Sequence, residues 1–191
     1  MLISTFELLV KRQLPRSITD SAGNEIVLPT SPLSRAIIQG YFLSIANTTD
    51  QNAGLLLNFK SVTSVIELPD LTATFLDTNG INLVGDVIPT VENAYQYPIT
   101  LAGNTTCLFI LQPDLLNPQA LTNLNIELRG YVDIQLDSKT SSAELLITPE
   151  HRGTFFRPGI NNNTPRSERQ LGEVAYSLPT ASGGSLFKLK R

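Results

Sequence analysis

The chain has 191 residues, of which 41% are hydrophobic and 16% are charged, with a formal net charge of −3. This length predicts one domain able to bury a sizeable core, and the slightly acidic balance excludes a broad basic surface for nucleic acid. The charged fraction is below the ~25% typical of globular proteins, and the mean hydropathy is +0.03. Two interpretations stay open: a weakly charged monomer, or a surface partly buried by copies of the chain or by another structural protein.

The single cysteine and the N-terminal residues limit the cellular compartments that the sequence predicts. Cys107 excludes an intramolecular disulfide framework, and it fits an apolar core position. No run approaches ~18 consecutive apolar residues, so we expect no membrane partner. Lys11 and Arg12 follow the first apolar stretch, whereas a secretory signal peptide carries its positive charge before it. We expect cytoplasmic synthesis without a signal peptide, with a virion or another assembled particle as one destination.

Residues 1–34 predict an N-terminal strand followed by an extended arm. Leu2–Val10 alternates in polarity as a strand does, and a sheet edge is one location for it. Ser21–Asn24 has the composition of a turn. Ile26–Leu28 predicts a short strand or part of the arm, and two prolines hold the chain extended after it.

The stretch from Arg35 to Val62 is the element around which the chain is organised. Ala36–Ala46 and Gly54–Val62 are apolar runs, and the first is rich in β-branched and aromatic residues. Gly40 would cost a helix roughly 1 kcal/mol relative to alanine. The polar cluster Asn47–Ala53 between the runs is typical of a turn. We predict a long β-hairpin.

Residues 71–111 predict two further strand pairs. Leu71–Leu76 and Ile81–Val84 flank the turn residues Asp77–Gly80, so we expect the second strand to pair back on the first. A tight turn at Ala102–Asn104 joins a strand ending at Leu101 to the following strand, Thr105–Leu111.

Two elements complete the segment 35–136. Asp114–Asn123 predicts one or two turns of helix, with Asp114 as the cap and Pro118 limiting the length. Leu124–Leu136 predicts a long strand. Its alternation changes phase near Gly130, which predicts a β-bulge there.

Three segments together resemble the immunoglobulin-like sandwich repeats of the Hydin and pilus-chaperone kind. They read FLSIANTTDQNAGLLLNF, YPITLAGNTTCLFILQP and LRGYVDIQL. The resemblance covers residues 35–136 and implies a B–C hairpin, an E–F pair and a G strand; it carries no functional residue. The Cys–Trp–Cys signature of antibody domains is absent, since the chain has one cysteine and no tryptophan. The expected fold class is all-β: a mainly antiparallel immunoglobulin-like β-sandwich with N- and C-terminal extensions.

Residues 137–191 predict a C-terminal extension, and the chain length predicts that it belongs to one compact domain with the rest of the chain. Ala143–Ile147 predicts a strand that Pro149 ends, and Val174–Leu178 and Ser185–Leu189 predict two short strands after a loop. We expect this extension either to dock on a neighbouring subunit or to fold back on its own domain.

One basic cluster is the candidate interface, and it interleaves arginines with aromatic rings. Its members are Arg152, Phe155, Phe156, Arg157, Arg166 and Arg169. Such a pattern can bind single-stranded nucleic acid, but nearby glutamates dilute the charge, so nucleic acid is disfavoured as a partner. A solvated face, or arginines that meet a neighbouring subunit, fits the pattern better.

No residue pattern indicates catalysis, a metal or a cofactor. His151 is the only histidine, and we predict a surface position for it; an enzyme would need it gathered with a carboxylate such as Glu127 or Asp133. One cysteine and one histidine cannot make the usual zinc site. Asp77–Gly80 shares the first positions of a calcium loop but lacks the closing glutamate, so a plain turn is the better interpretation.

The favoured function is a non-catalytic structural or assembly protein. The chain would be a self-associating β-sandwich subunit of a larger particle or filament, with a virion decoration or tail component as the most specific hypothesis. The alternative is a peptide- or glycan-binding module, for which Tyr95, Tyr97 and Tyr131 are candidate contacts. An enzyme is the third and least favoured class.

Overall fold

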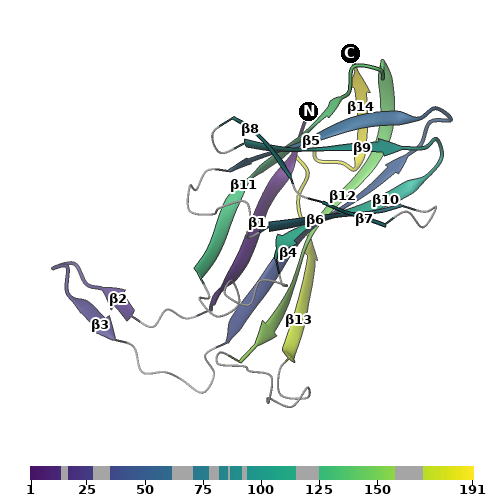
Figure 1. Cartoon of the computed structure of the whole chain (residues 1–191). Coiled ribbons are helices and arrows are strands. Elements are labelled where there is room, and N and C mark those ends of the chain that lie inside the picture. Colours follow the sequence, from purple (N-terminus) through teal and green to yellow (C-terminus); the bar gives the residue numbers. More distant parts are fainter. Residues whose placement is uncertain are drawn as a thin grey trace.

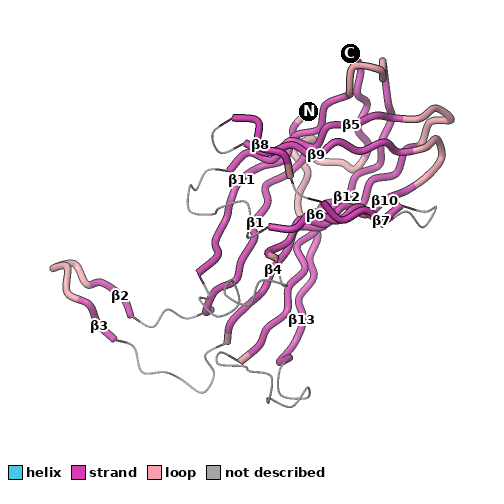
Figure 2. Tube along the Cα trace, in the orientation of Figure 1, coloured by secondary structure: helices cyan, strands magenta, loops and turns pink. Residues whose placement is uncertain are grey.

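The computed structural model describes residues 1–13, 17–27, 35–61, 71–77, 82–85, 87–91, 94–114, 125–157 and 170–191. Within these ranges the chain forms strands and no helix, and every strand pairing is antiparallel, which confirms the predicted all-β class (Figures 1 and 2). The predicted helix Asp114–Asn123 lies, after its first residue, outside the described residues.

The strands have the following bounds. They are β1 Leu2–Arg12, β2 Ser17–Thr19, β3 Glu25–Val27, β4 Ala36–Asn47, β5 Ala53–Ser61, β6 Leu71–Asp77, β7 Asn82–Gly85, β8 Ile88–Val91, β9 Ala94–Leu101, β10 Thr106–Pro113, β11 Asn125–Leu136, β12 Ser142–Phe156, β13 Gln170–Ser177 and β14 Leu186–Lys190. β2 and β3 pair only with each other, and the other strands form one curled sheet in which β7, β6, β10, β4, β1, β11, β5, β9 and β8 are successive neighbours. The expected return of residues 81–84 onto 71–76 is confirmed by the pairing of β6 with β7, whereas the turn at 78–81 lies outside the described residues.

The sheet divides into two layers at Gly40 of β4. On one edge of β4, residues 36–39 pair with β1 and residues 41–46 pair with β10. A Cβ at Gly40 would lie 3.1 Å from the Cβ of Gln112 and 3.2 Å from the carbonyl oxygen of Leu111, so a side chain here would press on β10 where it joins β4. Beyond this point β10, β6 and β7 extend one layer, while β1, β11, β5 and β9 extend the other (Figure 1).

A cluster of aromatic rings fills the space between the layers. Phe6 of β1 lies 5.7 Å from Phe59 of β5, centroid to centroid, and Phe59 stacks on Phe109 of β10 at 5.4 Å. Tyr41 and Tyr97 pack on the same group, and Cys107 is buried in the surrounding core, as its apolar sequence context predicts. The residues that face one another thus come from both layers, which is the packing of a β-sandwich.

The predicted hairpin between β4 and β5 is wrong. β4 pairs with β1, β10 and β12, whereas β5 pairs with β11 and β9, so the connection Thr48–Asn52 crosses from one layer to the other. The reason is that each strand carries a continuous apolar face, Tyr41–Leu43–Ile45 on β4 and Leu55–Leu57–Phe59 on β5. Those faces are buried completely when the strands lie in opposite layers.

The tight turn predicted at Ala102–Asn104 is also a crossing between layers, because β9 and β10 do not pair with each other. The two crossing loops hold one another: Asn104 N–H donates to the Thr49 carbonyl at 2.8 Å, and Asn47 N–H donates to the Thr105 carbonyl at 2.9 Å. Asn104 has φ 53°, a left-handed conformation that asparagine tolerates better than most residues.

β1 and β11 differ from expectation in two details. β1 lies between β11 and β4, so a sheet edge is the wrong location for it. The bulge predicted at Gly130 is absent, since residues 130–136 pair with β5 in one register, and the irregularity lies opposite, between Leu2 and Ser4. Gly130 is required by packing: a Cβ there would lie 2.0 Å from the Lys60 carbonyl oxygen and 2.8 Å from the Phe6 ring.

β12 continues through Pro149, so the prediction that this proline ends the strand is wrong. β12 pairs with β4 along the whole of β4, with Pro149 opposite Leu43. Ile147 N–H donates to Ser185 and Leu178 N–H donates to the Pro149 carbonyl, so these backbone groups face the opposite edge. The proline nitrogen therefore falls between β14 and β13, where no ladder hydrogen bond is lost.

Candidate functional site

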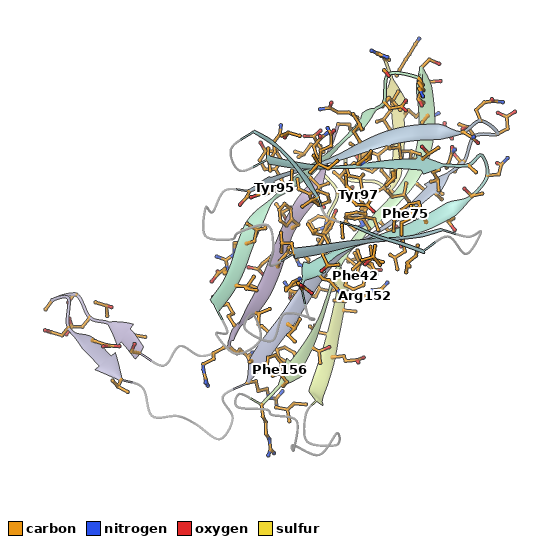
Figure 3. The ribbon with its side chains drawn as sticks, in the orientation of Figure 1. Phe42, Phe75, Tyr95, Tyr97, Arg152 and Phe156 are labelled. Atoms are coloured by element: carbon orange, nitrogen blue, oxygen red, sulfur yellow. The ribbon has the colours of Figure 1, made fainter. Side chains whose placement is uncertain are left out.

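The described members of the predicted basic cluster, residues 152 and 155–157, lie at the end of β12 and directly after it, where β12 pairs with β13. Figure 3 labels Arg152 and Phe156 among them. Phe155 and Phe156 are successive residues of one strand, so their side chains point to opposite faces, and both are half-buried. Arg157 is exposed. Arg166 and Arg169 lie outside the described residues, so an interface that joins all six side chains stays a prediction.

Arg152 already has partners in its own chain. Its guanidinium donates to the Glu150 carboxylate at 3.0 Å from Nε and lies 4.7 Å from the centre of the Phe42 ring (Figure 3). An exposed ion pair of this kind is worth less than ~1 kcal/mol, so Arg152 keeps its capacity to bind elsewhere. What it contributes here is cover for Phe42, an apolar side chain on the outer face of β4.

His151 is buried, so its predicted surface position is wrong. The ring is 5% exposed and packs against Tyr41 and Tyr176. Glu7 N–H donates to Nε2 at 2.9 Å, so Nδ1 carries the proton and donates to the Tyr176 hydroxyl at 3.0 Å. Alternation along β12 places His151 on the same face as Ile147 and Pro149, and this parity is the sequence signal for its burial.

The surroundings of His151 do not make a nucleophilic or acid–base site. Burial lowers the pKa of His151 below its ordinary value, which the nearby Glu7 carboxylate opposes in part. Glu127 forms ion pairs with Lys11 and Arg129, and neither it nor Asp133 is a hydrogen-bond partner of the histidine. Both ring nitrogens are occupied by hydrogen bonds, so the arrangement supports a structural role.

The three tyrosines considered for glycan or peptide contact do not share one surface. Tyr97 is 8% exposed and packs on Phe109, and Tyr95 packs against the core from the same face of β9 (Figure 3). Tyr131 projects from the outer face of β11, where the Lys60 ammonium lies 5.6 Å from its ring centre. An aromatic platform built from all three is therefore not present.

The hairpin of β2 and β3, residues 17–27, stands apart from the sandwich; we call it the arm (Figure 1). Residues 21–27 are all exposed. Ile18, Ile26 and Val27 are large apolar residues with 45%, 44% and 75% of their surface exposed. The sequence showed the turn and an extended second strand, but Ser17–Thr19 is too short for alternation to reveal a strand.

The tip of the arm is held in one shape by Asp20. Its carboxylate accepts hydrogen bonds from the backbone N–H of Ala22 and Asn24 and from the Asn24 side chain. These bonds, with that from the Asn24 backbone the strongest, lower the pKa of Asp20. Gly23 has φ 87°, which glycine adopts without strain. The turn of the arm thus has a defined conformation, although its residues 21–27 are exposed to solvent.

Among the open grooves that the described residues line, two lie at the borders of the sandwich. The first has a volume of about 440 Å³ and lies where β6 and β7 face β5 and β9, with Phe75, Leu83 and Tyr97 among its walls. The second has a volume of about 580 Å³ and lies between the end of β11 and β14. Among the described residues, no three histidine, cysteine or acidic side chains gather as metal ligands.

Comparison of the chain with protein-family models, with curated proteins and with solved structures found no match in any of the three. In the described part of the chain no helix is long and apolar enough to span a bilayer.

Proposed function

We propose that this protein is a non-catalytic structural subunit that associates with copies of itself through the arm. The observation that carries the proposal is the arm: a preformed hairpin with three exposed apolar side chains that contacts no other strand as a sheet neighbour. The sandwich would be the rigid body of each subunit, of immunoglobulin-like type, and a virion or filament would be the larger assembly.

Physical reasons support a partner for the arm. A lone two-stranded hairpin is marginally stable in water, because its hydrogen bonds compete with solvent and its apolar face is not buried. A surface that meets the face shared by the cross-strand partners Ile18 and Ile26 would remove both side chains from water, whereas Val27 points to the other face of the hairpin. The low charged fraction of the chain, 16%, also lowers the repulsion between copies that approach one another.

Replacement of the arm tests this function without disturbing the sandwich. Gln13 N–H donates to the Arg35 carbonyl at 2.7 Å, so a short glycine–serine turn can join these residues in place of 14–34. We expect the full chain to form oligomers, and the replaced chain to be monomeric with an unchanged far-ultraviolet spectrum. Mass by light scattering is the measurement, and a full chain that is monomeric at every concentration contradicts the proposal.

The first groove favours a second candidate function, a module that binds an extended peptide. β7 is the end strand of the sheet, and Leu83 on it is 53% exposed beside the groove. A peptide strand added to this edge would place alternate apolar side chains in the groove. Binding of extended apolar peptides that is lost in Leu83→Asp would support this candidate, and an arm-dependent oligomer without peptide binding would exclude it.

A further inference from the structure

We propose that the arm of one copy docks in the groove between β11 and β14 of a second copy, so that subunits join head to tail. This inference rests on the proposed function and specifies its contact. The chemistry of the two surfaces, their positions at opposite ends of β1 and the length of the chain between them support it.

The groove between β11 and β14 has an apolar floor and a basic rim. At the floor Leu136 is half-buried and Ile134 and Leu189 are buried, and Lys188, Lys190 and Arg191 form the rim. Lys188 is paired with Glu144 at 2.9 Å, whereas the ion pairs found among the described residues include no carboxylate partner for Lys190 or Arg191. Among the described strands β14 has β12 as its one partner, so its other edge is open to an added strand.

The arm has the complementary character. Residues 17–27 contain two acidic side chains, Asp20 and Glu25, and no lysine or arginine. Their charges are carried by the same hairpin that exposes Ile26 and Val27. An apolar edge with acidic residues beside it matches an apolar floor with a basic rim, and such complementarity sets both the partner and its orientation.

The arm cannot reach this groove in its own chain. The groove adjoins Met1 at the start of β1, whereas the arm leaves the sheet after Arg12 at the other end of β1. An eleven-residue strand is about 33 Å long at ~3.3 Å per residue. Ile18 follows Arg12 by six residues, which span at most roughly 21 Å when fully extended. Ile26 is paired with Ile18 and has the same limit, so the occupant is the arm of another copy.

The first groove is a poorer match for this arm. Asp137 lies on the wall of this groove. The hydrogen bond from the Thr140 side chain lowers the pKa of its carboxyl most, and backbone hydrogen bonds from Lys139 and Thr140 lower it further. An ionised Asp137 would repel Asp20 and Glu25, and like charges brought together at an interface weaken it. Charge therefore selects the basic groove.

A contact between unlike surfaces closes in a dimer only when two antiparallel copies exchange arms, whereas copies joined head to tail do not close in this way. Because arm and groove lie at opposite ends of the body, each added copy presents a free arm and a free groove to the next. The contact therefore gives a ring when the rotation between subunits closes and an open filament when it does not. Mass should grow beyond the dimer as concentration rises.

A complementation experiment tests the contact. One full-length variant carries Ile26→Ser and Val27→Ser in the arm, and a second carries Lys190→Glu and Arg191→Glu in the groove. Each alone should associate at least about tenfold more weakly than the wild type. Mixed together, the intact groove of the first and the intact arm of the second should form a 1:1 dimer that grows no further, as measured by sedimentation.

The outcomes separate this contact from self-association as such. A mixture that stays monomeric, or a single variant that assembles as the wild type does, overturns the head-to-tail contact while leaving oligomer formation by another surface. A wild type that never associates overturns both proposals. Ile88→Ser with Leu171→Ser is the matched control, because it removes exposed apolar side chains that line neither groove and should leave association unchanged.

A charge exchange provides a second test that does not depend on apolar side chains. Glu25→Lys should weaken association, and Glu25→Lys combined with Lys190→Glu in the same chain should restore it. All these residues are exposed, so the thermal unfolding of each variant should match that of the wild type. Failure of the exchange to restore association counts against the groove as the partner of the arm.

Discussion

Asn47 connects the two loops that cross between the layers. Its side chain is 1% exposed, and its Nδ2 donates to the carbonyls of Gln51 at 2.7 Å, Ala102 at 3.1 Å and Leu101 at 3.3 Å. Its Oδ1 accepts from the backbone and hydroxyl of Thr49. One side chain thus satisfies backbone groups of both loops in a place that water does not reach.

We expect Asn47→Ala to lower the free energy of unfolding by about 2–4 kcal/mol, because several buried polar groups would lose their partner at once. Urea unfolding followed by far-ultraviolet circular dichroism measures the change. Asn52→Ala, an exposed position in the same loop, is the control and should change stability by less than ~0.5 kcal/mol. Equal losses in the two variants would show that the Asn47 bonds are not what stabilises the crossing.

Gly130 offers a second test at this scale. We expect Gly130→Ala to destabilise the fold by about 1–3 kcal/mol, since the added Cβ would meet a backbone oxygen and an aromatic ring that are both held in the core. Gly172→Ala in β13 is the matched control, because a Cβ there meets nothing within 4 Å. Chemical denaturation of both variants gives the comparison, and a neutral Gly130→Ala would show that the fold accommodates a Cβ at this position.

His151 predicts a pH dependence of stability. Its folded-state pKa lies below the ordinary value of 6.5, chiefly through burial, so the unfolded chain binds a proton at higher pH than the folded one does. Stability should therefore fall as pH drops from about 7.5 to 5.5, by at most ~1.4 kcal/mol per pH unit. The carboxylates with lowered pKa, such as Glu127, lose their contribution only at lower pH.

His151→Gln is the variant that isolates this effect, because a glutamine can accept from Glu7 N–H and donate to Tyr176 but does not titrate. Thermal unfolding at several pH values should show a flat profile for the variant between pH 7.5 and 5.5. A wild type whose unfolding temperature is equally independent of pH between 7.5 and 5.5 would mean that the histidine is protonated without cost in the folded state.

At the scale of elements, β12 is the strand on which the layers depend. It pairs with every residue of β4, and it carries Leu145 and Ile147 into the core, while β14 adds Phe187. The segment 137–191 thus completes both layers of the sandwich.

We expect a chain that ends at Leu136 to remain unfolded. β4 would lose its neighbour along one whole edge, and the core would open on that side. One-dimensional proton spectra would show no dispersed amide or methyl signals for this truncation, whereas the arm-replaced chain should keep them. A folded truncation would contradict the central place given to β12.

The strands themselves could be predicted from alternation, but their partners could not. Alternation reveals which face of Ala36–Asn47 is buried, and the same pattern fits a hairpin or a crossing between layers. The turn residues between Asn47 and Ala53 suit both connections. The choice between a hairpin and a crossing depends on the surface against which each strand packs across the core. That surface includes segments about a hundred residues away, such as β12.

The candidate site was predictable only in part. The parity of β12 indicates that His151 is buried, although its charged neighbours Glu150 and Arg152 suggested the surface. The turn at Ser21–Asn24 was visible in the sequence, whereas the separation of the arm from the body follows from the pairing of Arg12 with Ala36. That pairing is a tertiary fact without a local signal.

At the scale of the whole molecule, one core joins the two layers of the large sheet. Its buried residues come from both layers, and the aromatic cluster of Phe6, Tyr41, Phe59 and Phe109 lies between them. Several of the strands that pair are distant in sequence, as with Leu2 opposite Asp133. Removal of either layer would expose the other, so neither has a core of its own.

We expect the sandwich to unfold in one transition. Tyrosine emission reports on the interior through Tyr41, which is fully buried, and far-ultraviolet circular dichroism reports on the strands. In the arm-replaced chain, which avoids effects of association, both probes should give the same midpoint in urea. Separate midpoints would show that the two layers are independent folding units.

The place where the chain leaves and re-enters the sheet has a consequence for engineering. Gln13 and Arg35 are hydrogen-bonded neighbours, so the sandwich requires only that the two ends of the segment between them lie close together. Any insert whose own ends lie close together meets the same requirement, whatever its sequence. The position of the arm is therefore an insertion site, where an unchanged sandwich can carry a foreign epitope or a small domain.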